Sequence, residues 1–94
     1  MPFGRSSDDY TQFQEVQLLL DADPLNRRVV DIFRRQSSAN GWSIAKMLDE
    51  DPNKVSVVLA KLRQGGLIDS ESGSGLDGYY FLTRLAYRLV PTAS

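Results

Sequence analysis

The residues best suited to binding chemistry lie mainly in residues 49–68, which read DEDPNKVSVVLAKLRQGGLI. In nucleic-acid recognition, asparagine pairs with adenine, lysine and arginine reach guanine or phosphate, serine bonds to either kind of group, and valine contacts a thymine methyl. Several of these residue types fall on one predicted helix of the stretch, and one lysine precedes it. The candidate DNA-binding residues are Asn53, Lys54, Ser56, Val57, Lys61, Lys46 and Arg63.

Three acidic residues, Asp49, Glu50 and Asp51, open the same stretch. Carboxylates at the start of a helix repel phosphate and neutralise part of the positive end of the helix dipole. Between Trp42 and Thr83, four basic residues stand against six acidic ones. The side chains of the stretch therefore suit DNA, whereas its acids suit a basic protein partner.

Enzymatic and metal chemistry is not expected. The chain contains no His and no Cys, and so lacks imidazole and thiolate metal ligands, disulfides and the commonest general base. The glycine-rich segment GSGLDG, residues 73–78, lies between two strand-like runs and is predicted to be a hairpin tip rather than a phosphate-binding loop. We expect no catalysis, no cofactor and no metal.

Length and composition predict one small globular domain. The chain has 94 residues, of which 41% are hydrophobic and 24% charged, with a net charge of −1. Because this charge is close to zero, any nucleic-acid site must be a local patch. No apolar run reaches the ~18 residues of a membrane span, and the N-terminus does not resemble a secretory signal. We therefore expect a cytoplasmic protein without membrane contact.

The stretch owes its predicted geometry to a helix over residues 52–64. Asp51 can accept hydrogen bonds from the first-turn amides, and Pro52 occupies a position that needs no amide donor. Gly65 and Gly66 then end the helix. Its apolar residues share one face, which leaves the candidate residues on the other. The predicted buried face consists of Val55, Val58, Leu59 and Leu62.

Several elements must precede this helix. Residues 1–9 are polar and contain Gly and Pro, so we expect a disordered tail. Residues 10–22 form an amphipathic segment, predicted as a short helix with a strand as the alternative. Asp23 then caps a helix that runs to about Ser37. The arginines of its outer face are expected to pair locally with Asp31, the aspartate among them, with a phosphate-binding strip as the alternative. These arginines are Arg27, Arg28, Arg34 and Arg35.

Residues 37–41, SSANG, are predicted to form a loop. Ser43 is then expected to cap a second, shorter helix that ends near Asp49. Its predicted inward-facing residues are Ile44, Met47 and Leu48. Beyond the helix over residues 52–64, the runs LIDSES and YYFLT predict a β-hairpin with a long, flexible tip at residues 73–78. Thr83 is expected to cap a last helical segment.

Three helices followed by a two-stranded hairpin is the order of a winged helix-turn-helix domain, an α+β fold that is mostly α. DPLNRRVVDIF resembles the opening of the first helix of ArsR-type bacterial regulators. WSIAKMLDEDPNKVSVVLAKLRQGGLI is similar to the helix-turn-helix and following strand of the ArsR and MarR groups, and YYFLT resembles their second wing strand. The resemblance covers residues 23 to about 85. It implies a winged domain over 23–94, flanked by helical segments, with the helix over 52–64 recognising a major groove.

The chain also departs from this family. Asp49 and Glu50 stand where the family commonly has a glycine and an apolar residue, and the wing tip carries no Lys or Arg, which disfavours a minor-groove contact. Metal sensing of the ArsR type is excluded, because its usual Cys and His ligands are missing.

Two hypotheses follow. The first is a small transcriptional regulator that binds double-stranded DNA as a homodimer, with residues 10–20 and 83–90 either forming the dimer surface or packing on their own domain. The alternative is a winged-helix protein-protein interaction module without DNA binding.

Overall fold

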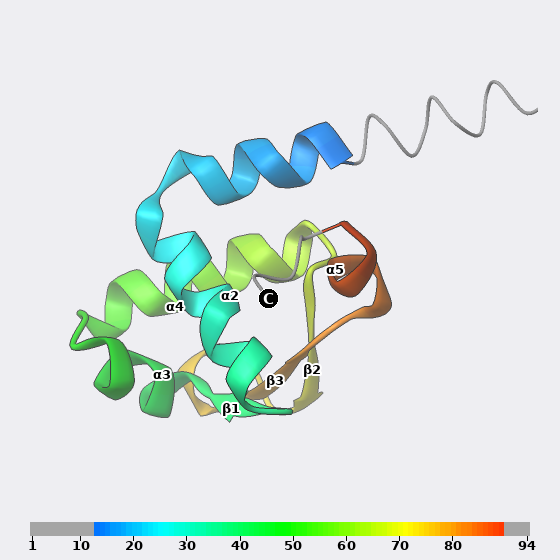
Figure 1. Ribbon diagram of the computed structural model, residues 1–94. Coiled ribbons are helices and arrows are strands. Elements are labelled where there is room, and N and C mark those ends of the chain that lie inside the picture. Colours follow the sequence, from blue (N-terminus) through cyan, green and yellow to red (C-terminus); the bar gives the residue numbers. More distant parts are fainter. Residues whose placement is uncertain (1–12, 90–94) are drawn as a thin grey trace, which may run out of the picture.

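The computed structural model describes residues 13–89, with side chains through residue 88, so the predicted tail lies outside the described residues. A helix over residues 13–22 comes first, which agrees with the helical prediction rather than the strand alternative. The elements that follow are α2 (Pro24–Arg35), β1 (Ala39–Asn40), α3 (Gly41–Leu48), α4 (Pro52–Gln64), β2 (Ile68–Ser72), the 3₁₀ turn η1 (Gly75–Asp77), β3 (Tyr79–Leu82) and α5 (Arg84–Leu89) (Figure 1).

The sheet is antiparallel and three-stranded, with the order β1-β3-β2. In the hairpin, Ile68 pairs with Leu82, and a β-bulge interrupts the register between Ser70 and Ser72. The two-residue strand β1 pairs with the other edge of β3, opposite Tyr79 and Tyr80. The prediction of a loop over residues 37–41 is therefore wrong at its centre. The chain forms a mostly helical α+β domain with a small antiparallel sheet.

The predicted helix caps at two aspartates are confirmed. The Leu25 N–H donates to Asp23 Oδ1 at 2.9 Å, and the Asn53 N–H donates to Asp51 Oδ1 at the same distance. Helix α2 ends at Arg35, slightly before the predicted end. Asp-Pro pairs thus begin both long helices, as their capping chemistry predicts.

Helix α3 begins earlier than predicted. Asn40, rather than Ser43, is its N-cap, and Asn40 Oδ1 accepts from the Trp42 N–H at 2.9 Å. This cap is available because β1 holds Asn40 in an extended conformation directly before the helix. Met47, predicted to face inward, is 44% exposed, and its sulfur accepts from Gln36 Nε2 at 3.6 Å.

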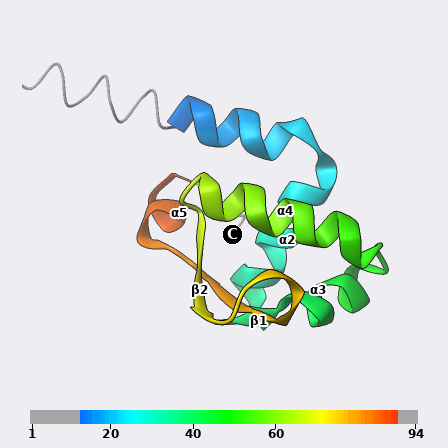
Figure 2. The ribbon, with the colours of Figure 1, turned by 180° about the vertical axis from the view of Figure 1, so that it is seen from behind.

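The core lies between the helices and one face of the sheet. Helix α4 contributes the whole predicted stripe, and Phe33, Ile44 and Tyr80 bring α2, α3 and β3 into the same cluster. The stripe residues Val55, Val58, Leu59 and Leu62 are all buried. The helix over residues 13–22 lies alongside α4 in both views (Figures 1 and 2) and packs Val16 and Leu20 into the core.

The hairpin tip, residues 73–78, is held against α3. Asn40 Nδ2 donates to the Asp77 carbonyl oxygen at 3.1 Å, and Trp42 Nε1 donates to Asp77 Oδ1 at 2.9 Å. Tyr80 Oη also donates to the Gly75 carbonyl oxygen at 2.8 Å. The tip therefore differs from the long flexible loop that its glycines predict.

Within the described residues, no helix combines the length and the apolar character needed to cross a membrane.

Candidate nucleic-acid interface

Helix α4 exposes most of the candidate residues. The side chains of Asn53, Lys54, Lys61 and Arg63 lie on the surface, and Val57 is 52% exposed, whereas Ser56 is half-buried. This face is the complement of the buried valine and leucine stripe, as the 3.6-residue period requires. The spacing of apolar residues thus predicted which side of α4 faces outward.

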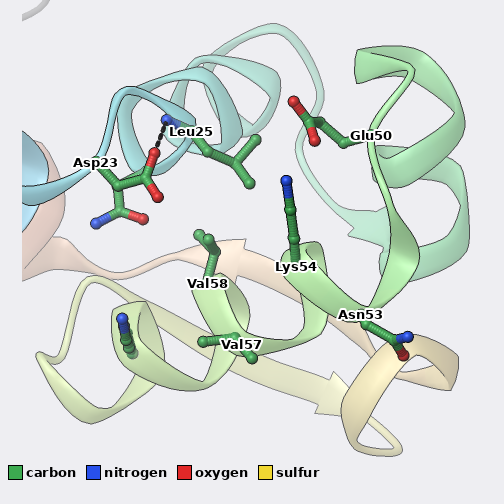
Figure 3. Close-up of a pocket in the computed structure, with 9 residues that line it drawn as sticks. Asp23, Leu25, Glu50, Asn53, Lys54, Val57 and Val58 are labelled. Carbon is green, nitrogen blue, oxygen red and sulfur yellow. Dashed lines mark hydrogen bonds between the residues drawn. The ribbon is translucent and has the colours of Figure 1, made fainter.

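A hollow of about 420 Å³ runs along one flank of this exposed face. We call it the lysine hollow, because Lys54 and Lys61 line it two helical turns apart. Its other wall is the start of α2, with Glu50 at the end nearest the α3–α4 turn. Figure 3 shows Lys54 directing its ammonium group into the space between Leu25 and Glu50. The full lining is Asp23, Leu25, Asn26, Glu50, Asn53, Lys54, Val57, Val58 and Lys61.

A second hollow, of about 340 Å³, follows the opposite flank of α4. Its lining from α4 includes Ser56, Ala60, Arg63 and Gln64, and the hairpin contributes Gly75 and Tyr80. Because both flanks are hollowed, the exposed face of α4 forms a ridge. Small side chains at positions 56 and 60 keep that ridge narrow.

The three acids at the start of the stretch have different surroundings. Arg28 of α2 places Nη1 3.4 Å from Glu50 Oε2, and its Nη2 donates to the Leu48 carbonyl oxygen at 3.0 Å. One side-chain oxygen of Asp51 accepts the hydrogen bond that caps α4. Asp49 is exposed and ends α3 in the left-handed backbone conformation. Glu50 is thus partly neutralised, which reduces the repulsion that the sequence predicted at this turn.

The basic candidate residues also differ in whether they form an ion pair. Among the described residues, Lys46, Lys54 and Lys61 form no ion pair, whereas Arg63 Nε lies 3.8 Å from Asp69 Oδ1. Ammonium groups that form no ion pair are the ones most available to an anionic partner.

The predicted local pairing of Asp31 with the α2 arginines is confirmed for one of them. Arg34 Nη1 lies 3.9 Å from Asp31 Oδ1, while Arg27 pairs with Asp21 at 2.5 Å. Arg27 is thus paired with the end of the preceding helix rather than with Asp31.

The structure brings four candidates together and separates three. Asn53, Lys54, Val57 and Lys61 share the lysine hollow, and Ser56 and Arg63 lie on the opposite flank of α4. Lys46 is exposed on α3 and lines neither hollow.

Sequence reasoning missed the contribution of α2. Asp23, Leu25 and Asn26 form one wall of the lysine hollow, although about thirty residues separate them from α4. The available signal was Asn26 itself, a polar residue three and seven positions before Val29 and Phe33 of the predicted apolar stripe. A buried amide needs a partner, so such a residue indicates a nearby polar contact.

Comparison with protein-family models, with curated proteins and with solved structures found no match to this chain. In the part of the chain that the structure describes, no group of three acidic side chains gathers as a metal site would require.

Proposed function

We propose that this protein is a winged-helix DNA-binding regulator that inserts α4 into a major groove. The observation that carries the proposal is the exposed ridge of α4, which bears lysines without ion pairs and has a hollow along each flank. A helix entering the major groove needs clearance on both sides for the two phosphate backbones. The element order of helix, short strand, two helices and hairpin also supports a winged helix.

The two flanks divide the proposed contacts into two kinds. Lys54 and Lys61, which line the lysine hollow, and Lys46 on α3 supply phosphate contacts, which fix the position of the helix. Asn53, Ser56 and Val57, at the N-terminal half of α4, supply base contacts.

The hairpin contributes little to this proposed interface. Its tip has no Lys or Arg and is tied to α3 through Asn40 and Trp42. Binding by α4 alone is modest and salt-sensitive, so we propose that a homodimer provides useful specificity. Phe13 and Leu18, which are 39% and 71% exposed on the N-terminal helix, offer an apolar surface for the second copy.

A titration of the full chain with random-sequence duplex, at low and at moderate salt, tests the proposal. A Lys54→Glu plus Lys61→Glu variant should bind about 1,000-fold more weakly, because each reversal replaces an attraction of about 1 kcal/mol near 4 Å in water by a repulsion of about the same size. The decrease of log affinity with log salt concentration should also become less steep, with the slope smaller in magnitude by about two.

The matched control reverses the charge of two arginines on α5, Arg84→Glu plus Arg88→Glu, and should change duplex affinity much less. Equal losses in the two double variants would refute the assignment of α4. Absence of binding by the parent at low salt would refute DNA binding itself.

The second candidate function is a protein-interaction module. The exposed Asp49 and the 52% exposed Val57 favour it, because together they suit a partner with basic and apolar groups. Absence of duplex binding by the parent chain at low salt would favour this function.

A further inference from the structure

Of the three asparagines in the chain, only Asn40 is followed by a glycine. An asparagine side chain can react with the amide nitrogen of the next residue. That nitrogen bonds to the side-chain carbonyl carbon, Cγ, while the bond from Cγ to the side-chain nitrogen breaks and ammonia leaves. Glycine favours this ring closure, because it has no Cβ to hinder the approach and its backbone is the most permissive. The sequence therefore makes Asn40 the most reactive asparagine of the chain.

The docked hairpin tip holds the two reacting groups of this dipeptide apart. Asn40 Nδ2 donates to the carbonyl oxygens of Asp77 at 3.1 Å and Gly78 at 3.5 Å. The Gly41 N–H donates to the same Gly78 carbonyl oxygen at 3.3 Å. Asn40 also has ψ of 146°, whereas ring closure needs a ψ at which the Gly41 nitrogen is eclipsed with Asn40 Cβ. The native conformation is therefore unreactive.

The structure around Asn40 also prevents the required rotation about ψ. Asn40 pairs with Tyr79 across β1 and β3, and Gly41 packs so closely on the tip that a Cβ there would lie 2.7 Å from Leu76 Cα. Rotation would therefore break the strand pairing or push the start of α3 into the tip. The tip must open first, and such local openings cost less free energy than global unfolding. The rate of ring closure thus follows the population of molecules with an open tip.

Hydrolysis of the ring makes the change permanent. Water opens the cyclic imide at either carbonyl and gives aspartate or isoaspartate, in which the main chain passes through Cβ and Cγ. Both products lack the Nδ2 donor, and an ionised carboxylate has no proton to offer the carbonyl oxygens of Asp77 and Gly78. Isoaspartate also lengthens the main chain before Gly41, which has no spare room beside Leu76. The tip therefore loses its attachment to the start of α3.

We propose that Asn40 is a site of spontaneous deamidation that the hairpin tip controls. The Gly41 nitrogen attacks Asn40 Cγ in molecules whose tip has left α3, and the carboxylate that results prevents the tip from docking again. The deamidated fraction therefore grows with the time that the tip spends open. This proposal is independent of the proposed DNA binding.

Incubation of the full chain in mildly alkaline buffer, with and without denaturing urea, tests the site. Peptide mass spectrometry measures deamidation at each asparagine, and Asn26 and Asn53, which precede Arg27 and Lys54, are the internal comparisons. In urea, Asn40 should react at least about tenfold faster than either, because only Asn40 precedes a residue without Cβ. Without urea, the Asn40 rate should fall at least about tenfold, because only molecules with an open tip react. Equal rates at all three asparagines in urea overturn the site, and equal Asn40 rates with and without urea overturn the protection.

Asp77→Ala is the variant that loosens the tip, and Glu71→Ala is the matched control. Both remove an exposed carboxylate from the hairpin, but Asp77 accepts from Trp42 Nε1 of α3, whereas Glu71 forms no hydrogen bond or ion pair with a described residue. Loss of one such bond should about double the open population, and with it the Asn40 deamidation rate without urea. The control should keep the parent rate. Equal rates in the two variants overturn the control by the tip.

Asn40→Asp reproduces one product and tests the release of the tip. The Trp42 emission spectrum should change, because the tip that carries its acceptor, Asp77, no longer docks. Asn53→Asp is the matched control at an exposed asparagine whose side chain forms no hydrogen bond with a described residue, and it should keep the parent spectrum. Parent chain that has deamidated at Asn40 should show the same change as Asn40→Asp, so the test does not depend on how well the variant folds. A parent-like spectrum in the deamidated chain overturns the release.

Discussion

The exposed face of α4 and the hairpin tip are both polar surfaces, yet they use their polar groups in opposite ways. On α4, the side chains of Asn53, Lys54 and Lys61 form no hydrogen bond and no ion pair with a described residue. At the tip, the Asp77 carboxylate accepts a hydrogen bond from Trp42 of α3, and its carbonyl oxygen accepts one from Asn40, the N-cap of α3.

This difference separates a surface available to a partner from one that stabilises the domain. A polar group already paired inside the protein must break that bond before it can bind anything else. Side chains without internal partners give up only their hydration. This contrast agrees with the proposed binding role of α4 and with a structural role for the tip, and substitutions at each region can test that division.

The largest expected effect is on the close contact between the tip and α3. A Cβ at Gly41 would lie 2.7 Å from Leu76 Cα and 2.8 Å from its carbonyl oxygen, both of which are backbone atoms. Gly41→Ala should therefore lower the free energy of unfolding by about 2 kcal/mol, measured by urea denaturation.

Gly75→Ala provides the control for this experiment. Gly75 has φ of +61° and no heavy atom within 4 Å of a built Cβ, so alanine there meets backbone strain without a clash. That strain should cost about 1 kcal/mol. If Gly41→Ala were the milder of the two changes, the tip would not be closely packed on α3, and the comparison with α4 would fail.

The sequence predicts α4 well because its determinants are local. Asp51 and Pro52 lie at its start, Gly65 and Gly66 follow its end, and its buried stripe follows from the helical period alone. Helix capping, helix termination and periodicity each depend on residues that are close in the sequence, so they can be predicted from the sequence alone. The outward position of the candidate side chains then follows.

The tip and the start of α3 were harder to predict because their determinants are distant. Asn40 caps α3 and pairs with Tyr79, and Trp42 bonds to Asp77, although more than thirty residues separate each pair. Locally, Ser43 is an equally good cap, and residues 73–78 have the composition of a mobile turn. The α2 wall of the lysine hollow was missed for the same reason.

An intermediate effect is expected at Asp51, where the α4 cap and the proposed binding face meet. Asp51→Ala should lower the free energy of unfolding by about 1 kcal/mol, because the Asn53 amide loses its acceptor. Asp51→Asn keeps a good capping oxygen and should leave stability nearly unchanged.

The same pair of variants separates capping from charge. Both remove a carboxylate from the helix end nearest the proposed phosphates, so both should raise duplex affinity a fewfold at low salt. A loss of stability in the asparagine variant as large as in the alanine variant would contradict the assigned capping role. Unchanged duplex affinity in both would show that this end of α4 lies away from DNA.

The smallest expected effect is at the hydrogen bond that holds the end of the tip. Asp77→Ala removes the acceptor for Trp42 Nε1, a partly exposed bond worth about 0.5 kcal/mol of unfolding free energy. Asp77→Asn keeps an acceptor oxygen and should preserve most of the bond. Trp42 is the only tryptophan in the chain, so its fluorescence spectrum reports this contact directly.

The fluorescence and DNA measurements on these two variants sharpen the comparison with α4. Only the alanine variant should change the Trp42 emission, because only it releases the indole N–H. At moderate salt neither should alter duplex affinity by more than about twofold, since a solvent-exposed charge is then partly screened. A gain in affinity as large as that expected at Asp51 would place the tip at the binding surface, and the proposed division between the two regions would be wrong.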